Sequence, residues 1–168
     1  MPPLQIDNPF WRFSLQVYGT AGVADECISV QDKLGIDVNV LLFAAWLGAA
    51  RGVVIRDADI QRISAAVATW SADVVQPLRV VRRGLKQNME IADVAVQALR
   101  KQVAGAELFA EQVEQAMLFR MADDLGEKGA GSDHAARANL SVVLASSGAG
   151  VDPFPLPKLV AAVSLACG

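Results

Sequence analysis

Histidine, tyrosine and cysteine are scarce in this chain of 168 residues, which has one histidine, one tyrosine and two cysteines. Cys27 and Cys167 lie far apart and form no metal-binding pair, so we expect two free thiols. A di-iron bundle needs Glu-x-x-His on two helices, and His134 has no glutamate three residues before it. No phosphate-binding loop, dinucleotide-binding glycine pattern or nucleophile elbow is present. We therefore expect no metal, no cofactor and no catalytic residue, and we favour a protein that is not an enzyme.

Long apolar runs and a secretory signal are also missing. Hydrophobic residues make up 53% of the chain, yet no run reaches the roughly 20 residues that cross a bilayer. The start, MPPLQIDNPFWR, has no basic segment followed by an apolar one. The net charge of −3 argues against general nucleic-acid affinity. We expect a cytoplasmic protein with no membrane span and no nucleic-acid partner.

The most apolar stretch, Val40 to Ala50, contains no charged residue. A helix that is apolar on all sides is normally buried on all sides. Asp37 is a good N-cap and Gly52 a good stop, so the sequence predicts a buried central helix over about 38–51. The remaining helices are predicted to pack around it.

Helical periodicity continues through most of the chain, and no convincing period-two strand is found. Thr20 is predicted to cap the second helix, Gly105 to break a later one, and Ser132 to cap the helix after a glycine-rich loop at 126–131. Pro77 is predicted to kink a helix rather than end it. The predicted helices are 9–18, 21–34, 38–51, 58–87, 89–103, 106–125, 132–147 and 157–166. The fold class is therefore all-α: a single domain over residues 1–168, an orthogonal or irregular bundle of seven to eight helices, with a Pro-rich segment at 150–157 that pins Phe154 and Leu156 into a groove.

A basic face follows Pro77, at the helical spacing i, i+3, i+4 and i+7. Its members are Arg79, Arg82, Arg83 and Lys86. Guanidinium groups bind phosphates and carboxylates well, so this face is a candidate site for an anionic ligand or acidic partner. The alternative is a solvated or internally paired face, because Glu107, Glu111 and Glu114 share one face of a later helix.

Polar residues gather just before the central helix: Gln31, Asp32, Asp37 and Asn39. Such a cluster either ties a turn to neighbouring backbone or presents amides and a carboxylate at the mouth of a pocket. Three tryptophans, Trp11, Trp46 and Trp70, either fill the core or line a pocket, and Trp46 and Trp70 fall on predicted core faces.

Four segments resemble a family of small bacterial helical proteins known only as a domain of unknown function. They are FWRFSLQVYG (10–19), VQDKLGIDVNVLLFAAW (30–46), W-x6-PLR-x2-R (70–82) and ELFAEQVEQAMLF (107–119). The Gln-Asp-x-x-Gly-x-Asp-Val-Asn-x-Leu-Leu block is the most specific part, and Val30 stands where leucine is usual. The resemblance covers about residues 9–122 and does not extend beyond Gly126. It implies a bacterial, cytoplasmic, all-helical protein, and it brings no activity, substrate or site residue.

Two functions follow as hypotheses. The first is a non-enzymatic binding or regulatory protein that uses the basic face to engage an anionic ligand or acidic protein partner. The second is a small-molecule-binding protein or enzyme with an apolar pocket near Trp46 and Trp70, with Gln31, Asp32 and Asn39 at its mouth. A homo-oligomer that buries surplus apolar surface is a third, structural option.

Overall fold

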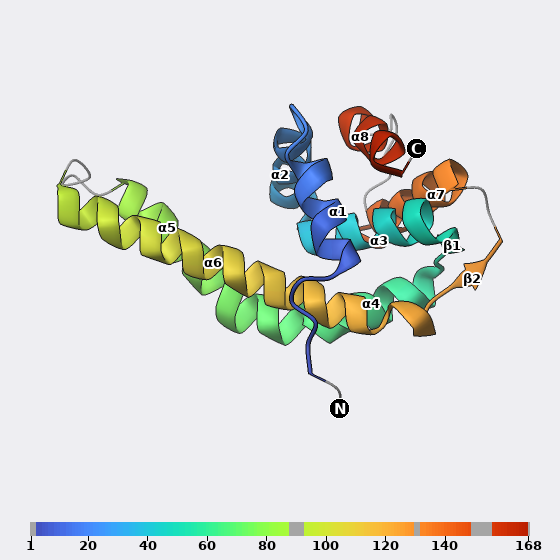
Figure 1. Cartoon of the computed structure of the whole chain (residues 1–168), viewed down its shortest axis with the longest axis horizontal. Coiled ribbons are helices and arrows are strands. Elements are labelled where there is room, and N and C mark those ends of the chain that lie inside the picture. The colour runs from blue at the N-terminus through green and yellow to red at the C-terminus, as the bar shows by residue number, and fades with distance from the viewer. Residues whose placement is uncertain (1–2, 88–92, 130–131, 149–155, 168) are drawn as a thin grey trace.

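The computed structural model describes residues 3–87, 93–129, 132–148 and 156–167 (Figure 1). The described residues form α-helices with two very short strands, which confirms the all-α prediction. The helices are α1 (Pro9–Tyr18), α2 (Val23–Leu34), α3 (Val38–Arg51), α4 (Asp57–Trp70), α5 (Gln76–Gln87), α6 (Val94–Arg120), α7 (Ser132–Ser146) and α8 (Pro157–Cys167). The strands β1 (Val53–Val54) and β2 (Glu127–Lys128) pair antiparallel.

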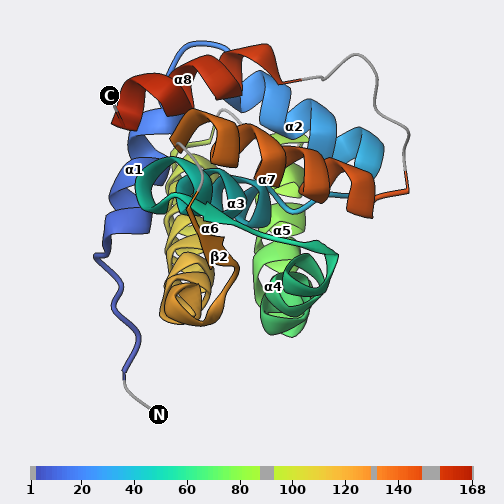
Figure 2. The ribbon, with the colours of Figure 1, turned by 90° about the vertical axis from the view of Figure 1, so that its right-hand side faces the viewer.

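The predicted central helix has the predicted bounds. Asp37 accepts a hydrogen bond from the backbone N–H of Asn39 and caps the start of α3, and Gly52 ends it in the left-handed conformation, with φ at 62°. Every residue of α3 from Asn39 to Ala49 is buried. Figure 2 shows α3 enclosed by α1, α2, α6, α7 and α8. Buried apolar residues from these helices and α4 form one cluster, and the single domain over residues 1–168 stays a prediction.

One close helix crossing holds α7 against α3. Gly48 lies so near α7 that an added Cβ would stand 2.3 Å from the backbone nitrogen of Ala136. Asn139 on α7 is fully buried and donates to the carbonyl oxygens of Ala44 (3.0 Å) and Val53 (2.8 Å). Its Oδ1 accepts from the N–H of Ile55 at 2.9 Å. One buried side chain therefore ties α7 to the middle of α3 and to the strand that follows it.

Pro77 does not end the helix in which it lies. Five residues of π-helix, Ser71–Val75, join α4 to α5, and the N–H of Gln76 bonds to the carbonyl oxygen of Ser71. A proline has no N–H to bond the carbonyl one turn before it, and the wider π turn accommodates this missing hydrogen bond, so the helix continues. Residues 57–87 are thus one continuous helical segment, as predicted for 58–87.

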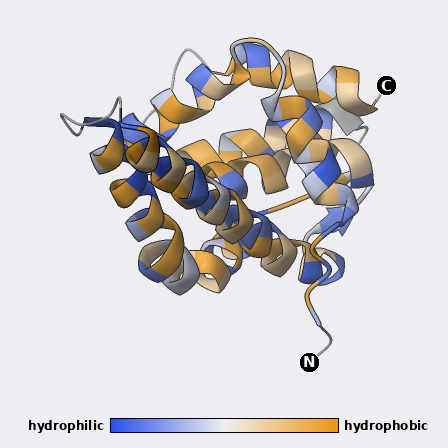
Figure 3. Cartoon of the chain, turned by 60° about the vertical axis from the view of Figure 1, so that its left-hand side comes forward, coloured by the Kyte–Doolittle hydropathy of each residue, from blue (hydrophilic) through white to orange (hydrophobic). Residues whose placement is uncertain are grey.

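The long helix α6 runs antiparallel to α4 and α5, and together they extend well beyond the rest of the molecule (Figure 1). The predicted break at Gly105 is wrong, because α6 passes through it without interruption. A glycine within a helix costs only about 1 kcal/mol relative to alanine, which the packing of a long helix outweighs. Figure 3 shows hydrophilic residues concentrated along this extension, while the body is mainly apolar.

Three further predictions about loops need correction. Thr20 does not cap α2: its hydroxyl donates to the carbonyl oxygen of Gln16, and Gly22, with φ at 81°, is the residue before the helix. Part of the predicted loop at 126–131 is strand β2, and Ser132 is the first residue of α7 rather than its cap. Residues 149–155, including Phe154, lie outside the described part, whereas Leu156 is fully buried before α8.

Candidate functional site

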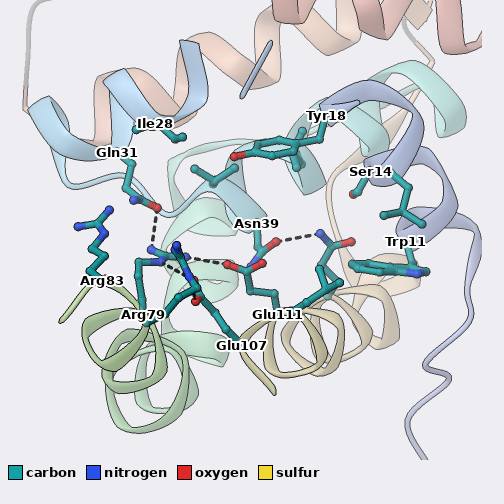
Figure 4. Close-up of a pocket in the computed structure, with 16 residues that line it drawn as sticks. Trp11, Ser14, Tyr18, Ile28, Gln31, Asn39, Arg79, Arg83, Glu107 and Glu111 are labelled. Carbon is teal, nitrogen blue, oxygen red and sulfur yellow. Dashed lines mark hydrogen bonds and ion pairs between the residues drawn. The ribbon is translucent and has the colours of Figure 1, made fainter. Parts of the chain in front are cut away.

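A cavity of about 260 Å³ lies where α1, α2, α3, α5 and α6 meet (Figure 4). Its two sides differ in chemistry. Arg79, Arg83 and Gln31 stand on one side, and Trp11, Ser14 and Tyr18 from α1 stand on the other. The remaining lining residues are Leu15, Ile28, Val38, Asn39, Leu42, Arg82, Glu107, Leu108, Glu111 and Gln115.

The charged side is a network of ion pairs between α5 and α6. Arg79 pairs with Glu111 (2.7 Å) and with Glu107 (3.3 Å), and its Nη1 donates to Oε1 of Gln31 at 3.0 Å. Arg82 donates to both carboxylate oxygens of Glu107. The internally paired alternative for the basic face is therefore confirmed for Arg79 and Arg82.

The pKa shifts in this network follow from burial and from the ion pairs. Burial alone raises the pKa of Glu107, but Arg82 and Arg79 outweigh it and hold the pKa below its usual value. At Glu111, burial outweighs the bond to Arg79, and the pKa is raised. Burial lowers the pKa of Arg79, yet its bonds to Glu111 and Glu107 raise it overall. Glu107 is thus held ionised as the shared anion of both arginines.

A buried chain of polar side chains forms the floor beside α3. The amide of Asn39 donates to Oε2 of Glu114 at 3.2 Å, and its Oδ1 accepts from Nε2 of Gln115 at 2.8 Å. Asp37, besides capping α3, accepts from the hydroxyl of Ser71 at 3.0 Å. Asn39, Glu114 and Gln115 are all at most 8% exposed. The residues before and at the start of α3 are therefore tied to α6 and to the π-helix.

Glu114 is fully buried and carries the largest perturbation of any carboxyl group in the described chain. Burial is the main cause, and the charge of Asp37 and a hydrogen bond to it add to the effect, raising the pKa of Glu114 to about 9. Glu114 therefore keeps its proton at neutral pH. It is not among the cavity-lining residues, so it does not meet the cavity contents directly.

Two lining side chains have polar atoms without a partner among the described residues. Ser14 and Gln115 are 2% and 3% exposed, and neither Oγ of Ser14 nor Oε1 of Gln115 has a hydrogen-bond partner. A buried polar group left unpaired costs about 1–3 kcal/mol. Both atoms belong to residues that line this cavity, which marks it as a place where a further molecule would satisfy them.

The predicted site residues are only partly brought together. Gln31, Asn39, Arg79, Arg82 and Arg83 line the cavity, whereas Asp32 and Lys86 are exposed and do not. As binding residues, all of them stay predictions.

Of the three tryptophans singled out in the sequence, Trp11 lines the cavity, whereas Trp46 and Trp70 do not. Trp46 packs in the core against Phe10, Phe43 and Phe119, and the indole N–H of Trp70 donates to the carbonyl oxygen of Ala110 at 2.9 Å. The aromatic side comes instead from Trp11 and Tyr18 on α1. A sequence signal existed for these residues, since both fall off the Phe10–Phe13–Val17 core stripe of that helix.

A second hollow, of about 360 Å³, lies at the start of α3 and is lined by residues from the turn between α2 and α3, from α4, from the π-helix and from α7. Asp37 and Ser71 line it and bond to each other. None of the unpartnered buried atoms found in the described chain belongs to its lining. It is therefore the weaker candidate, although it is larger.

Within the described residues, no group of three His, Cys, Asp or Glu side chains is placed to hold a metal ion. His134 is exposed, and burial raises the pKa of the Cys27 thiol to about 12, so this thiol is unreactive. In the same part of the chain, no helix combines the length and the apolarity that a bilayer crossing requires.

Residues 9–118 match the model of a protein family described as "Protein of unknown function (DUF2390)". The chain belongs to this family. Neither the curated proteins nor the solved structures contain a match. The matched segment runs from α1 into α6 and includes every residue that lines the cavity. The family match bears out the resemblance seen in the sequence, and the function of the family is unknown.

Proposed function

We propose that this DUF2390 protein binds a small molecule in the cavity between α1, α2, α3, α5 and α6. The observation that carries the proposal is the mixed lining of this cavity: an apolar and aromatic side, a charged side, and two buried side chains, Ser14 and Gln115, whose Oγ and Oε1 have no partner among the described residues. Ligand sites typically combine apolar walls with a few convergent polar groups. The volume of about 260 Å³ lies just below the usual range for such sites, which favours a small ligand.

A binding role is better supported than a catalytic one. Catalysis needs an acid, base or nucleophile with a suitable pKa that reaches the substrate. Glu114 has a strongly raised pKa but does not line the cavity, and the two glutamates that line it, Glu107 and Glu111, are both paired with arginine. We therefore keep the hypothesis of a non-enzymatic binding or regulatory protein.

The basic face as a docking surface for an acidic protein has less support. Two of its four cations, Arg79 and Arg82, are engaged by Glu107 and Glu111 inside the fold. Arg83 and Lys86 remain exposed. An acidic partner would meet only these two charges without disrupting existing ion pairs, and exposed pairs each contribute little.

The cavity proposal is tested by closing its mouth. Leu108 lines the cavity and is 52% exposed, so Leu108→Trp adds bulk at the mouth without disturbing the core. We expect small aromatic fragments to show saturation-transfer NMR signals with the wild type and to lose them with Leu108→Trp.

The neighbouring residue supplies the matched control. Phe109 is 57% exposed on the same helix and does not line the cavity, so Phe109→Trp should bind the fragments as the wild type does. Fragment signals that survive Leu108→Trp, or fragments that never bind a folded wild type, would refute ligand binding in this cavity.

A further inference from the structure

The charged side of the cavity has a net charge that follows from how its glutamates and arginines pair. Glu107 receives hydrogen bonds on both oxygens from Arg79 and Arg82, and Glu111 accepts from Arg79. The negative charges of the two glutamates thus balance the positive charges of these two arginines. Arg83 is the third arginine on the lining, and in the described part of the chain it forms no ion pair. The cavity edge therefore carries one uncompensated positive charge.

Gln31 adds a donor beside that charge. Its Oε1 accepts from Nη1 of Arg79, and this assignment is secure because a guanidinium has only donors. The amide NH₂ of Gln31 must then point away from Arg79. Figure 4 shows Gln31 next to the Arg83 guanidinium on the same side of the cavity. Two donor groups, one of them cationic, stand together there, and a carboxylate is the acceptor that fits them.

We propose that the ligand is a small monocarboxylic acid. Its carboxylate binds Arg83 and the Gln31 amide, its apolar body lies along Leu42, Leu108 and Trp11, and a hydroxyl or amide N–H at its far end donates to Gln115 Oε1. This inference rests on the proposed function of the cavity. A dianion such as phosphate fits less well, because Glu107 and Glu111 border the same edge and only one charge is uncompensated.

The test uses matched pairs of ligands in isothermal titration calorimetry. The probes are para-hydroxyphenyl propanoate, butanoate and pentanoate, each beside its neutral primary amide, which has the same shape. We expect at least one carboxylate to bind about fivefold more tightly than its amide, the size expected for an exposed charge pair, and the preference to shrink with added salt.

Two variants locate the charge preference. Arg83→Gln should abolish the difference between carboxylate and amide, while Lys86→Gln, which removes an exposed cation that does not line the cavity, should keep it. Removal of the phenol hydroxyl from the probe should weaken binding to the wild type but not to Gln115→Met. Circular dichroism confirms that each variant is folded.

The outcomes separate the two proposals. Equal binding of carboxylates and amides, or a preference that survives Arg83→Gln, overturns the carboxylate inference and leaves the cavity as a binding site for neutral molecules. Failure of every probe and of the fragments to bind overturns both. A preference lost equally in Lys86→Gln would show that the long-range field, and not the Arg83–Gln31 pair, selects the acid.

Discussion

Replacement of Glu114 by glutamine should stabilise the protein at neutral pH. In the folded protein Glu114 has a pKa of about 9, against an ordinary value of 4.5. Between these values the folded state holds a proton that the unfolded state has released. Stability is therefore greatest below the ordinary pKa and falls as the pH rises towards 9.

The magnitude follows from proton linkage. Each pH unit in this window costs the wild type about 1.4 kcal/mol of unfolding free energy. At pH 7, two and a half units above the ordinary value of 4.5, the accumulated cost is about 3 kcal/mol. Glutamine has the shape of the protonated acid, can accept from the Asn39 amide as Glu114 does and can donate to Asp37. Glutamine carries no titrating proton, so the Glu114→Gln variant does not lose this unfolding free energy as the pH rises.

Urea unfolding followed by far-ultraviolet circular dichroism at several pH values between 5 and 8 measures this difference. The advantage of Glu114→Gln over the wild type should grow with pH along the slope given above, reaching about 3 kcal/mol at pH 7. The matched control is Glu127→Gln on β2, which removes an exposed carboxylate paired with Arg56 and should change stability by less than about 1 kcal/mol. An advantage that does not change with pH would refute the reasoning, because Glu114 would then ionise alike in both states.

The remaining predictions concern packing. Gly48→Ala should destabilise the protein by several kcal/mol in thermal unfolding, because its Cβ would strike the backbone of α7. Gly84→Ala on α5, which has open space around it, should stabilise the protein by up to about 1 kcal/mol. Equal effects of the two substitutions would contradict the close crossing of α3 and α7. Asn139→Leu should cost roughly 3 kcal/mol or more in urea unfolding, because three buried backbone groups lose their partner, and a loss below about 1 kcal/mol would show that water replaces the amide.

Structural features that depend only on residues close together in the chain could be predicted from the sequence. The start and end of α3 follow from Asp37 and Gly52, and the start of α1 follows from Asn8, whose side chain accepts from the N–H of Trp11. The helix through Pro77 was also predictable, because the apolar pattern resumes at once after the proline. In each case the deciding groups lie within a few residues of one another.

Features that depend on distant segments were not predictable. Strand β2 has two residues and no periodicity, and it forms only because β1 lies beside it. Gly105 resembles a helix end locally, but α6 continues because it packs along α5. The cavity also depends on segments that lie far apart in the sequence. The charge stripes on α5 and α6 could be read from their spacing, whereas the angle that brings Trp11 and Tyr18 of α1 to the opposite wall could not.

The orientation of the buried amides links Glu114 to the chemistry of the cavity. Oε2 of Glu114 accepts from the side-chain amide of Asn39. Asn39 must then turn its Oδ1 towards Gln115, and Gln115 must use its NH₂ to donate to it. Of the Gln115 amide, the carbonyl oxygen is then left unpartnered among the described residues. A ligand therefore has to bring a donor to this point, and the requirement originates two side chains away, in the Glu114 oxygen that accepts from Asn39.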